Sequence, residues 1–316
     1  TRQREIGWAT TLEASYIGSK GTHLKQNFNR NAAVIDPRAA NLPGGPRQWL
    51  TQLIPNMGSI SDTDTLGRSW YNGLSINAIK RFSDGLDFNV GYTWSHVNTD
   101  VGTTLSGSDR VTKNPQDFSY NYSNAGFDMR DRFTTSFLYE LPFGRGKQYG
   151  ADWNKAVDAI AGGWQINGIL ALYSGFHTTP TTSFRGGSFG AYTPDPVSGQ
   201  DPNQAPSGGR TPDQWWDASA VQNPEMGSWG AISSMYLTRP GQKNLDFSLF
   251  KRFSITERFA LVYRAEFLNL FNTPFYGTPG RSFRGDTSNP QDGGFSRITG
   301  TNGNPRNIQM MLRLEF

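Results

Sequence analysis

The last residues of the chain alternate strictly in the direction their apolar side chains point. Ile308, Met310, Leu312, Leu314 and Phe316 occupy every second position, and the residues between them are polar except Met311. Because successive side chains of a β-strand face opposite sides, this pattern predicts a strand with one apolar and one polar face. A water-soluble sheet can show the same pattern, so its recurrence along the chain becomes the important observation.

The alternation recurs in seven earlier segments of about 10–14 residues, close to the length that a tilted membrane strand needs. Residues 86–95 show it most regularly, with Leu86, Phe88, Val90, Tyr92 and Trp94 on one face. The other predicted strands lie near residues 9–17, 70–81, 130–141, 164–174, 244–253 and 259–267, with a stub at residues 1–5. The first includes Trp8 on its apolar face. Trp and Tyr gather near the strand ends, which is typical of the aromatic girdles at membrane surfaces.

The connections between these segments alternate in length. Short connections are expected at residues 82–85 and 254–257, with an intermediate one at 142–163, and long ones at 18–69, 97–129, 175–243 and 272–305. Outer-membrane barrels have short periplasmic turns and longer extracellular loops. The sequence therefore predicts an all-β, antiparallel transmembrane β-barrel fragment of about eight strands plus a stub, in the outer membrane of a Gram-negative bacterium.

The composition agrees with a barrel better than with a soluble core. Only 35% of residues are hydrophobic and the mean hydropathy is −0.57, yet the chain has 21 Phe, 12 Tyr and 9 Trp. No stretch approaches the roughly 18–20 apolar residues of a spanning helix. The net charge of +4 comes without a dense basic cluster, so nucleic-acid binding is not expected. The chain has no cysteine, which excludes disulfides and thiolate metal sites.

Four segments resemble a known family. They read YIGSKGTHL (16–24), ELPFGRGK (140–147), GGWQINGILALYSGF (162–176) and RAEFLNLFNTPFYGTP (264–279). With the terminal Phe316, they look like the carboxyl-terminal barrel of Oar-like TonB-dependent transporters, which often carry a carboxypeptidase-regulatory-like domain. The resemblance implies 22 strands around a plug, so residues 1–316 are expected to be the carboxyl-terminal part of such a barrel. The start at Thr1, without a signal peptide, also suggests a piece of a longer protein.

The resemblance further implies a function and its partners. The chain would form barrel wall and present extracellular loops that capture a substrate for energy-coupled uptake. Its partners would be outer-membrane lipid, an amino-terminal plug, the TonB energy-coupling complex and the barrel-assembly machinery. That machinery would recognise Met310, Leu312, Leu314 and Phe316. The substrate stays open among siderophores, glycans and peptides.

Aromatic side chains in the connection at 175–243 are candidates for substrate contact, because exposed rings stack on sugars and pack on peptides. They are Trp215, Trp216, Trp229 and Tyr236. The alternative is that these rings pack the loop onto its neighbours. On the last two strands, Arg264, Glu266, Arg313 and Glu315 are expected on the polar face as structural partners or plug contacts.

No catalytic, cofactor or metal site is expected. His23, His96 and His177 are widely separated and have no metal-binding spacing, and no Ser-His-Asp arrangement can be argued from their positions. His96 follows the strand ending at Ser95 and could touch a ligand. Asp62, Asp64 and the acidic residues of 195–201 could hold Ca²⁺, but they do not match a calcium-loop pattern and are better explained as solvated loop residues.

Two other functions remain open from the sequence alone. The chain could be a complete eight-stranded outer-membrane barrel acting as an adhesin or structural protein, since eight strands can close. It could also be a secreted carbohydrate-binding β-sandwich. A sandwich would bury the apolar faces between two sheets, whereas a barrel wall would expose them as one belt about 25 Å tall. An open sheet with two unpaired edges would favour a fragment.

Overall fold

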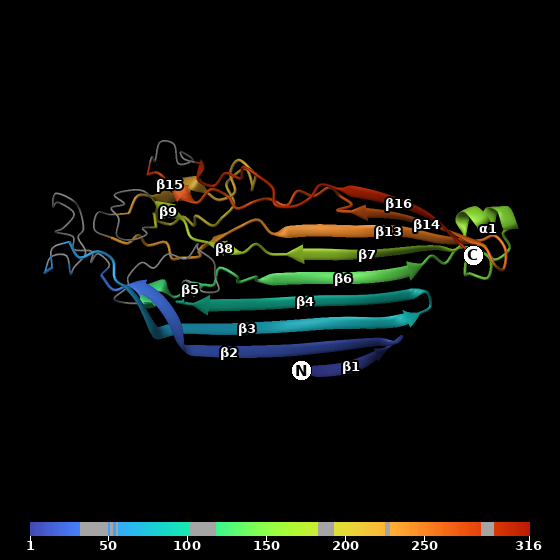
Figure 1. The fold of residues 1–316 in the computed structure, drawn as a ribbon, viewed down its shortest axis with the longest axis horizontal. Coiled ribbons are helices and arrows are strands. Elements are labelled where there is room, and N and C mark those ends of the chain that lie inside the picture. The colour runs from blue at the N-terminus through green and yellow to red at the C-terminus, as the bar shows by residue number, and fades with distance from the viewer. Residues whose placement is uncertain are drawn as a thin grey trace.

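A computed structural model describes residues 1–31, 50, 53, 54, 56–101, 118–182, 193–224, 228–285 and 294–316. One antiparallel sheet dominates it, and Figure 1 shows its long strands lying side by side. In their order across the sheet, the long strands are β1 (Arg2–Gly7), β2 (Thr10–Asn29), β3 (Ser61–Ser83), β4 (Leu86–Thr99), β6 (Asp131–Glu140), β7 (Trp164–Tyr173), β13 (Gln242–Ser254), β14 (Ala260–Leu268) and β16 (Asn307–Glu315). The two-residue β5 (Ser123–Asn124) pairs with the end of β4.

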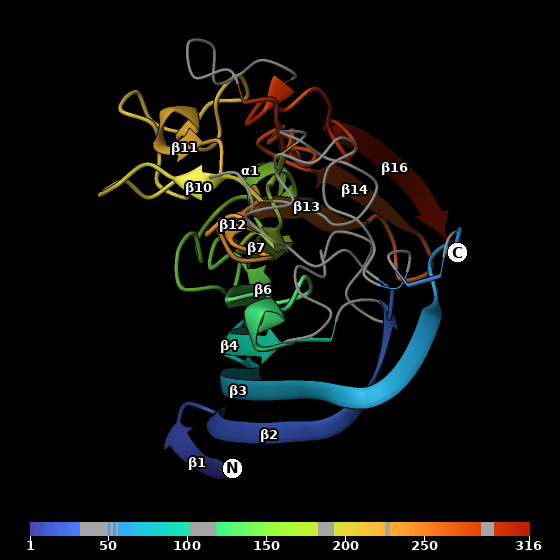
Figure 2. The ribbon, with the colours of Figure 1, turned by 90° about the vertical axis from the view of Figure 1, so that its left-hand side faces the viewer.

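The sheet is a single curved layer and does not close. Figure 2 views it end-on and shows the strands following an open arc from β1 to β16. Among the described residues β1 pairs only with β2, and β16 pairs only with β14, so both edges of the sheet are unpaired. The predicted all-β antiparallel architecture of eight strands plus a stub is confirmed, with β1 in the place of the stub.

The strand registers bring the apolar faces together. Tyr16 lies opposite Leu74, which lies opposite Trp94, and a second row crosses the rest of the sheet. That row contains Phe88, Phe137, Gly168, Phe247, Phe267 and Ile308. A Cβ atom on Gly168 would lie 2.9 Å from the ring of Phe137, so glycine leaves space for that ring. Paired residues share a face, so the apolar faces predicted for the separate strands form one surface.

This apolar surface is exposed rather than packed against a second layer. Met310, Leu312 and Leu314 each keep more than half of their surface exposed, and Leu12, Tyr16, Leu74 and Ile76 are also exposed. The segment from Leu86 to Trp94 spans about 26 Å at the rise of about 3.3 Å per strand residue, close to the height of a barrel's lipid belt. The alternative of a soluble β-sandwich is therefore wrong, because a sandwich would bury these side chains.

The two ends of the sheet differ, and we call them the turn end and the loop end. At the turn end, Trp8 and Ala9 join β1 to β2, and Asp84 and Gly85 join β3 to β4, all four with positive φ. That geometry is typical of the tight hairpin turns that Asp-Gly favours. The connection from β6 to β7 also lies there and contains α1 (Lys155–Ala161), at the same end of the sheet as the carboxyl terminus (Figure 1).

Two sequence predictions need correction near the ends of the sheet. The strands β2 and β3 extend well beyond 9–17 and 70–81, so both ends of the expected loop at 18–69 are paired strand. The pairing has register shifts between Gly21 and Leu24 and again before Gln26. The alternation predicts Trp8 on a strand face, but Trp8 lies in the β1–β2 turn because two residues with positive φ are needed there.

The remaining elements are short and lie at the loop end. They are η3 (Phe118–Asn121), β8 (His177–Thr178), β9 (Thr181–Thr182), β10 (Asp195–Pro196), η4 (Ala218–Ala220), β11 (Val221–Gln222), β12 (Leu237–Thr238) and β15 (Ser282–Phe283). Three small ladders join β8 to β12, β10 to β11 and β9 to β15. No helix in the described part of the chain is long and apolar enough to cross a membrane.

Candidate functional site

The long connections at the loop end pack around a hydrophobic core of their own. We call this group of buried side chains the loop core; it consists of Trp216, Ala218, Val221, Ile232, Leu237, Phe283 and Phe295. Its members come from two connections that are far apart in the sequence. The ring of Phe295 lies between those of Trp216 and Phe283, with centroids 6.0 and 5.9 Å away. The long connections therefore form one folded unit at the loop end, which we call the loop body, and not a set of separate loops.

Polar contacts hold the two central tryptophans in this body. The indole Nε1 atoms of Trp215 and Trp216 both donate to the carbonyl of Thr238, at 3.2 and 2.7 Å. Their backbone amides both donate to Oγ of Ser296, at 2.9 and 2.7 Å. Buried indole and amide groups need such partners, because leaving one unpaired costs about 1–3 kcal/mol.

The four aromatic residues predicted to contact substrate occupy different positions here. Trp216 has no exposed surface and belongs to the loop core, so its position matches the alternative role of packing the loop. Trp215, Trp229 and Tyr236 are only partly buried. Trp215 stacks under the guanidinium of Arg210, 5.4 Å from the ring centroid. Contact of the three partly buried rings with a substrate stays a prediction.

Tyr236 is fixed by a carboxylate. Its hydroxyl donates to Oδ1 of Asp201 at 2.7 Å. Burial, together with this hydrogen bond and the charge of Asp201, raises the pKa of Tyr236 to about 12. Burial also lowers the pKa of Arg210, against the charge of Asp201. Asp201, one of the acidic residues considered above as a Ca²⁺ ligand, thus accepts a hydrogen bond from Tyr236 and interacts with the charge of Arg210.

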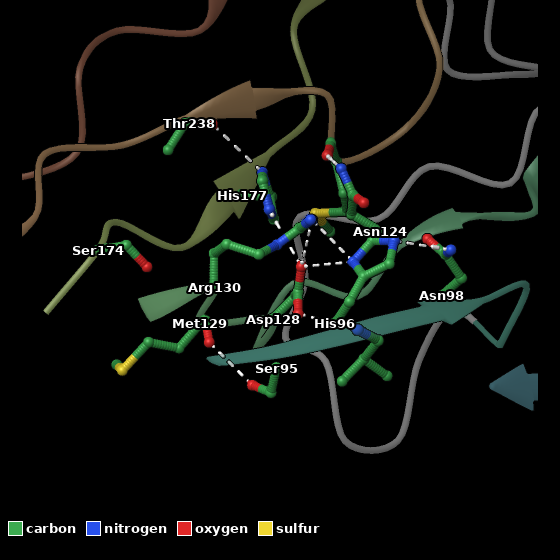
Figure 3. Close-up of polar contacts among 12 residues, drawn as sticks. Ser95, His96, Asn98, Asn124, Asp128, Met129, Arg130, Ser174, His177 and Thr238 are labelled. Carbon is green, nitrogen blue, oxygen red and sulfur yellow. Dashed lines mark hydrogen bonds and ion pairs between the residues drawn. The ribbon is translucent and has the colours of Figure 1, made fainter. Parts of the chain in front are cut away.

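A cluster of polar side chains joins the loop body to the strand ends, and Figure 3 shows it around Asp128. Oδ2 of Asp128 lies 3.2 Å from Nδ1 of His96, 3.2 Å from Arg130 and 3.3 Å from Nε2 of His177. Oδ1 accepts a hydrogen bond from the amide of Val97 at 2.9 Å. His177 also lies 3.4 Å from the hydroxyl of Thr238 in β12. We call Asp128, His96, Arg130 and His177 the rim cluster.

The electrostatics of the rim cluster favour an ionised carboxylate. The side chain of Asp128 is fully buried, and burial by itself raises its pKa. The contacts with His177, the Val97 amide and His96, together with the charge of Arg130, outweigh burial and hold the pKa of Asp128 below its ordinary value. The carboxylate therefore links the end of β4, the start of β6 and the segment after β7.

The sequence did not predict that His96 and His177 would meet. The strand predicted to end at Ser95 continues to Thr99, so His96 lies within β4, and His177 begins β8, shortly after β7. Because β4, β6 and β7 are neighbours in the sheet, the strand order alone would bring the two histidines to the same place. Among the described residues, no group of three or more His, Asp or Glu side chains is arranged to hold a metal ion. Asp62, weighed for Ca²⁺, pairs with Arg30. His23 lies in the irregular part of β2, with positive φ.

The four charged residues predicted on the polar face lie there and form ion pairs. Arg264 pairs with Glu266 on its own strand at 2.6 Å, and Arg313 likewise pairs with Glu315. Glu315 also forms an ion pair with Arg252 of β13, with 3.2 Å between Nε of Arg252 and Oε2 of Glu315. All lie on the face opposite the apolar surface, as their registers show.

The predicted assembly signal lies on the unpaired edge of the sheet. Met310, Leu312 and Leu314 of β16 form part of the apolar surface, and they pair with Ala265, Tyr263 and Leu261 of β14. Phe316 follows the strand and is 94% exposed. This edge offers free backbone groups beside an apolar face, the arrangement that templated strand addition needs.

Comparison with known proteins gave one family match. A family model described as an outer membrane beta barrel domain matches residues 1–309. Solved structures similar to this chain include the outer membrane transporter YddB from Escherichia coli, with 8% identity and a TM-score of 0.43, and P. aeruginosa FpvA bound to heterologous pyoverdines, with 11% identity and a TM-score of 0.36. Each alignment covers 99% of this chain, which spans 31% and 32% of the length of those proteins. No curated protein matches.

Proposed function

Because the chain belongs to the outer membrane beta barrel domain family, we propose that it forms part of the barrel wall of a TonB-dependent receptor of the Oar-like kind. The chain lies in the outer membrane, where its apolar surface meets lipid. In such barrels the short turns face the periplasm and the long loops face outside. The turn end would thus be periplasmic, and the loop end would receive a substrate.

One observation carries the proposal: in the described part of the chain, the sheet has a continuous apolar surface but two unpaired edges, at β1 and β16. Unpaired backbone groups are costly in hydrocarbon, so a sheet that crosses a membrane must be closed. Further strands, outside residues 1–316, would complete the barrel and surround a plug, as the family resemblance implies. The open edges favour this proposal over a closed eight-stranded adhesin.

The loop body suits substrate capture. Binding residues commonly lie on loops that a rigid scaffold positions, and the loop core with the rim cluster would supply that scaffold here. Trp215, Trp229 and Tyr236 would offer rings to a glycan, peptide or siderophore, while Trp216 supports them from below. Uptake would need energy from the TonB complex acting through the plug. We assign no catalytic step to the chain.

Uptake by whole cells tests the proposal. Cells with and without the intact protein would be given labelled ferric siderophores, oligosaccharides and peptides, each with and without a protonophore. We expect one class to accumulate only in cells with the protein, and only without the protonophore. Accumulation to the same level with and without the protonophore would contradict energy-coupled uptake. If none of the three classes of compound accumulates, transport itself is contradicted.

A further inference from the structure

A basic cavity lies at the turn end of the sheet, on the opposite side of the molecule from the loop body. It has a volume of about 540 Å³ and lies between the β6–β7 connection and the end of β13. Five basic residues and one carboxylate are among its lining: Arg145, Lys147, Lys155, Lys251, Arg252 and Asp158. We call this cavity the turn-end pocket. Its excess of positive charge calls for an anionic ligand.

Several of these charges are not neutralised within the protein. Among the described residues, Arg145 and Lys155 form no ion pair, and both side chains are exposed. The carboxylate among the lining residues, Asp158, already has a partner, because its Oδ1 accepts a hydrogen bond from the backbone amide of Arg145 at 2.7 Å. Lys147 pairs with Glu140 and Arg252 with Glu315, two carboxylates on the polar face of the sheet, so Arg145 and Lys155 are the basic residues left for a ligand on the lipid-facing side.

The pocket has a closely packed wall. A Cβ atom on Gly144 would lie 3.0 Å from the Cα of Gly162, and one on Gly162 would lie 2.3 Å from Oδ1 of Asp158. Lys251, which is only 3% exposed, donates to the carbonyls of Ala159 at 2.7 Å and Asp158 at 3.3 Å in the last turns of α1. These contacts fix the helix against the end of β13.

The register of β13 places the pocket beside the apolar surface. Lys251 lies opposite Trp164, and Phe253 lies opposite Leu261, both on the lipid-facing side. The ammonium of Lys251 lies 4.8 Å from the ring centroid of Phe253 and 5.3 Å from that of Trp164. Nε1 of Trp164 donates to the carbonyl of Ile160 at 2.8 Å. The helix α1 is therefore attached to the lipid-facing side of the sheet.

The surroundings of the pocket are apolar and exposed. Val157 and Ile160 are neighbours on the same face of α1, and Ile160 keeps 75% of its surface exposed. Phe143, Tyr149 and Ile255 nearby are also exposed. Apolar and aromatic side chains next to basic ones are typical of elements that lie in the headgroup layer of a membrane.

We propose that the turn-end pocket binds the phosphate headgroup of an anionic phospholipid in the periplasmic leaflet of the outer membrane. Arg145 and Lys155 contact the phosphate, while Ile160 and Val157 lie among the upper acyl carbons. Lys251 holds α1 in position for both contacts. The site is separate from substrate capture and requires only that the apolar surface faces lipid.

Lipid retention tests this site. The intact protein would be extracted from nanodiscs of phosphatidylethanolamine and phosphatidylglycerol, and its bound phospholipid measured by native mass spectrometry. Arg145→Gln with Lys155→Gln should lower phosphatidylglycerol retention by about tenfold or more, given roughly 1 kcal/mol for each basic residue near an anionic surface. Arg145→Lys with Lys155→Arg should retain it, and Ile160→Ser should weaken it.

Matched controls distinguish a site from general attraction. Arg81 and Arg258 are exposed basic residues at the turn end that do not line the pocket. If Arg81→Gln with Arg258→Gln lowers retention as much, or if the pocket variant retains as much lipid as the unmodified protein, the proposal is overturned. Displacement of the lipid by millimolar inorganic phosphate would also overturn it, since that result indicates a site for the free ion.

Discussion

Nε2 of His177 lies 3.3 Å from Oδ2 of Asp128, a carboxylate with no exposed surface. The two residues belong to different connections, so the contact ties the segment after β7 to the segment before β6. His96 in β4 and Arg130, directly before β6, contact the same oxygen. The rim cluster therefore fixes how the loop body sits on the strand ends.

Replacing the central carboxylate should loosen this junction. Asp128→Asn removes the charge and leaves Arg130 and two histidines around a buried amide, so we expect local opening at 118–130 and 176–182 to become easier by about 2–4 kcal/mol. Hydrogen exchange measures that opening. Asp84→Asn is the control, because the β3–β4 turn accepts Asn-Gly as well as Asp-Gly. Equal protection in Asp128→Asn and unmodified protein would contradict the role of the cluster.

The junction should also weaken in acid. The folded-state pKa of Asp128 lies below its ordinary value of 3.8, so the folded protein binds that proton more weakly than the unfolded chain. Its stabilising contribution is complete above the ordinary value and is lost as the pH falls through the folded pKa. Hydrogen exchange at the rim should show this loss, and Asp128→Asn should remove that part of the pH dependence. The same pH dependence in Asp128→Asn and in the unmodified protein would argue against this role of Asp128.

Trp216 should be essential to the loop core and not to ligand contact. Trp216→Ala removes a fully buried ring that packs on Phe295, and we expect a cost of about 3–5 kcal/mol in the stability of the loop body. Phe271→Ala, at a residue that is 73% exposed, should cost less than about 0.5 kcal/mol. Protease resistance of the loop end under increasing urea would compare the two. Similar protease resistance in the Trp216→Ala and Phe271→Ala variants would contradict the role of Trp216 in the loop core.

The terminal aromatic residue should matter for assembly. Deleting Phe316 from the intact protein removes the last apolar residue of the edge strand, and we expect less protein in the outer membrane and more in the periplasm. Phe316→Tyr keeps an aromatic terminus and should assemble normally. Cell fractionation and heat-dependent gel migration report assembly. Normal assembly without Phe316 would contradict the assigned signal.

The strand faces could be read from the sequence because lipid enforces them. Each segment that crosses the apolar belt must alternate, and Leu86 to Trp94 does so with the same period as Met310 to Phe316. The extensions of β2 and β3 could not be read in this way. They include Gly18, Gly21 and several polar residues, and no periodic pattern marks a strand whose two faces are both solvated.

The loop end was less predictable for a related reason. The ring of Trp216 is buried by Phe283 and Phe295, which lie in another connection, and neither local composition nor periodicity reveals such contacts. Trp215 and Trp216 are adjacent and chemically alike, yet only Trp216 is fully buried. The rim cluster could in principle be predicted from the sequence, since His96 lies near the end of β4 and His177 shortly after β7, strands that a meander of antiparallel neighbours places close together.

The account depends on lipid being the solvent of the apolar surface, and the adjacent Met310 and Met311 test this directly. They are the same residue type on opposite faces of β16, and the chain contains no cysteine that would compete for a label. Met310→Cys and Met311→Cys in the intact protein would each carry a nitroxide, exposed in turn to lipid-soluble oxygen and to a water-soluble nickel chelate. We predict that the label at 310 responds mainly to oxygen and the label at 311 much less so. Equal oxygen response at both positions, or a label at 310 that only the nickel chelate reaches, would contradict the account.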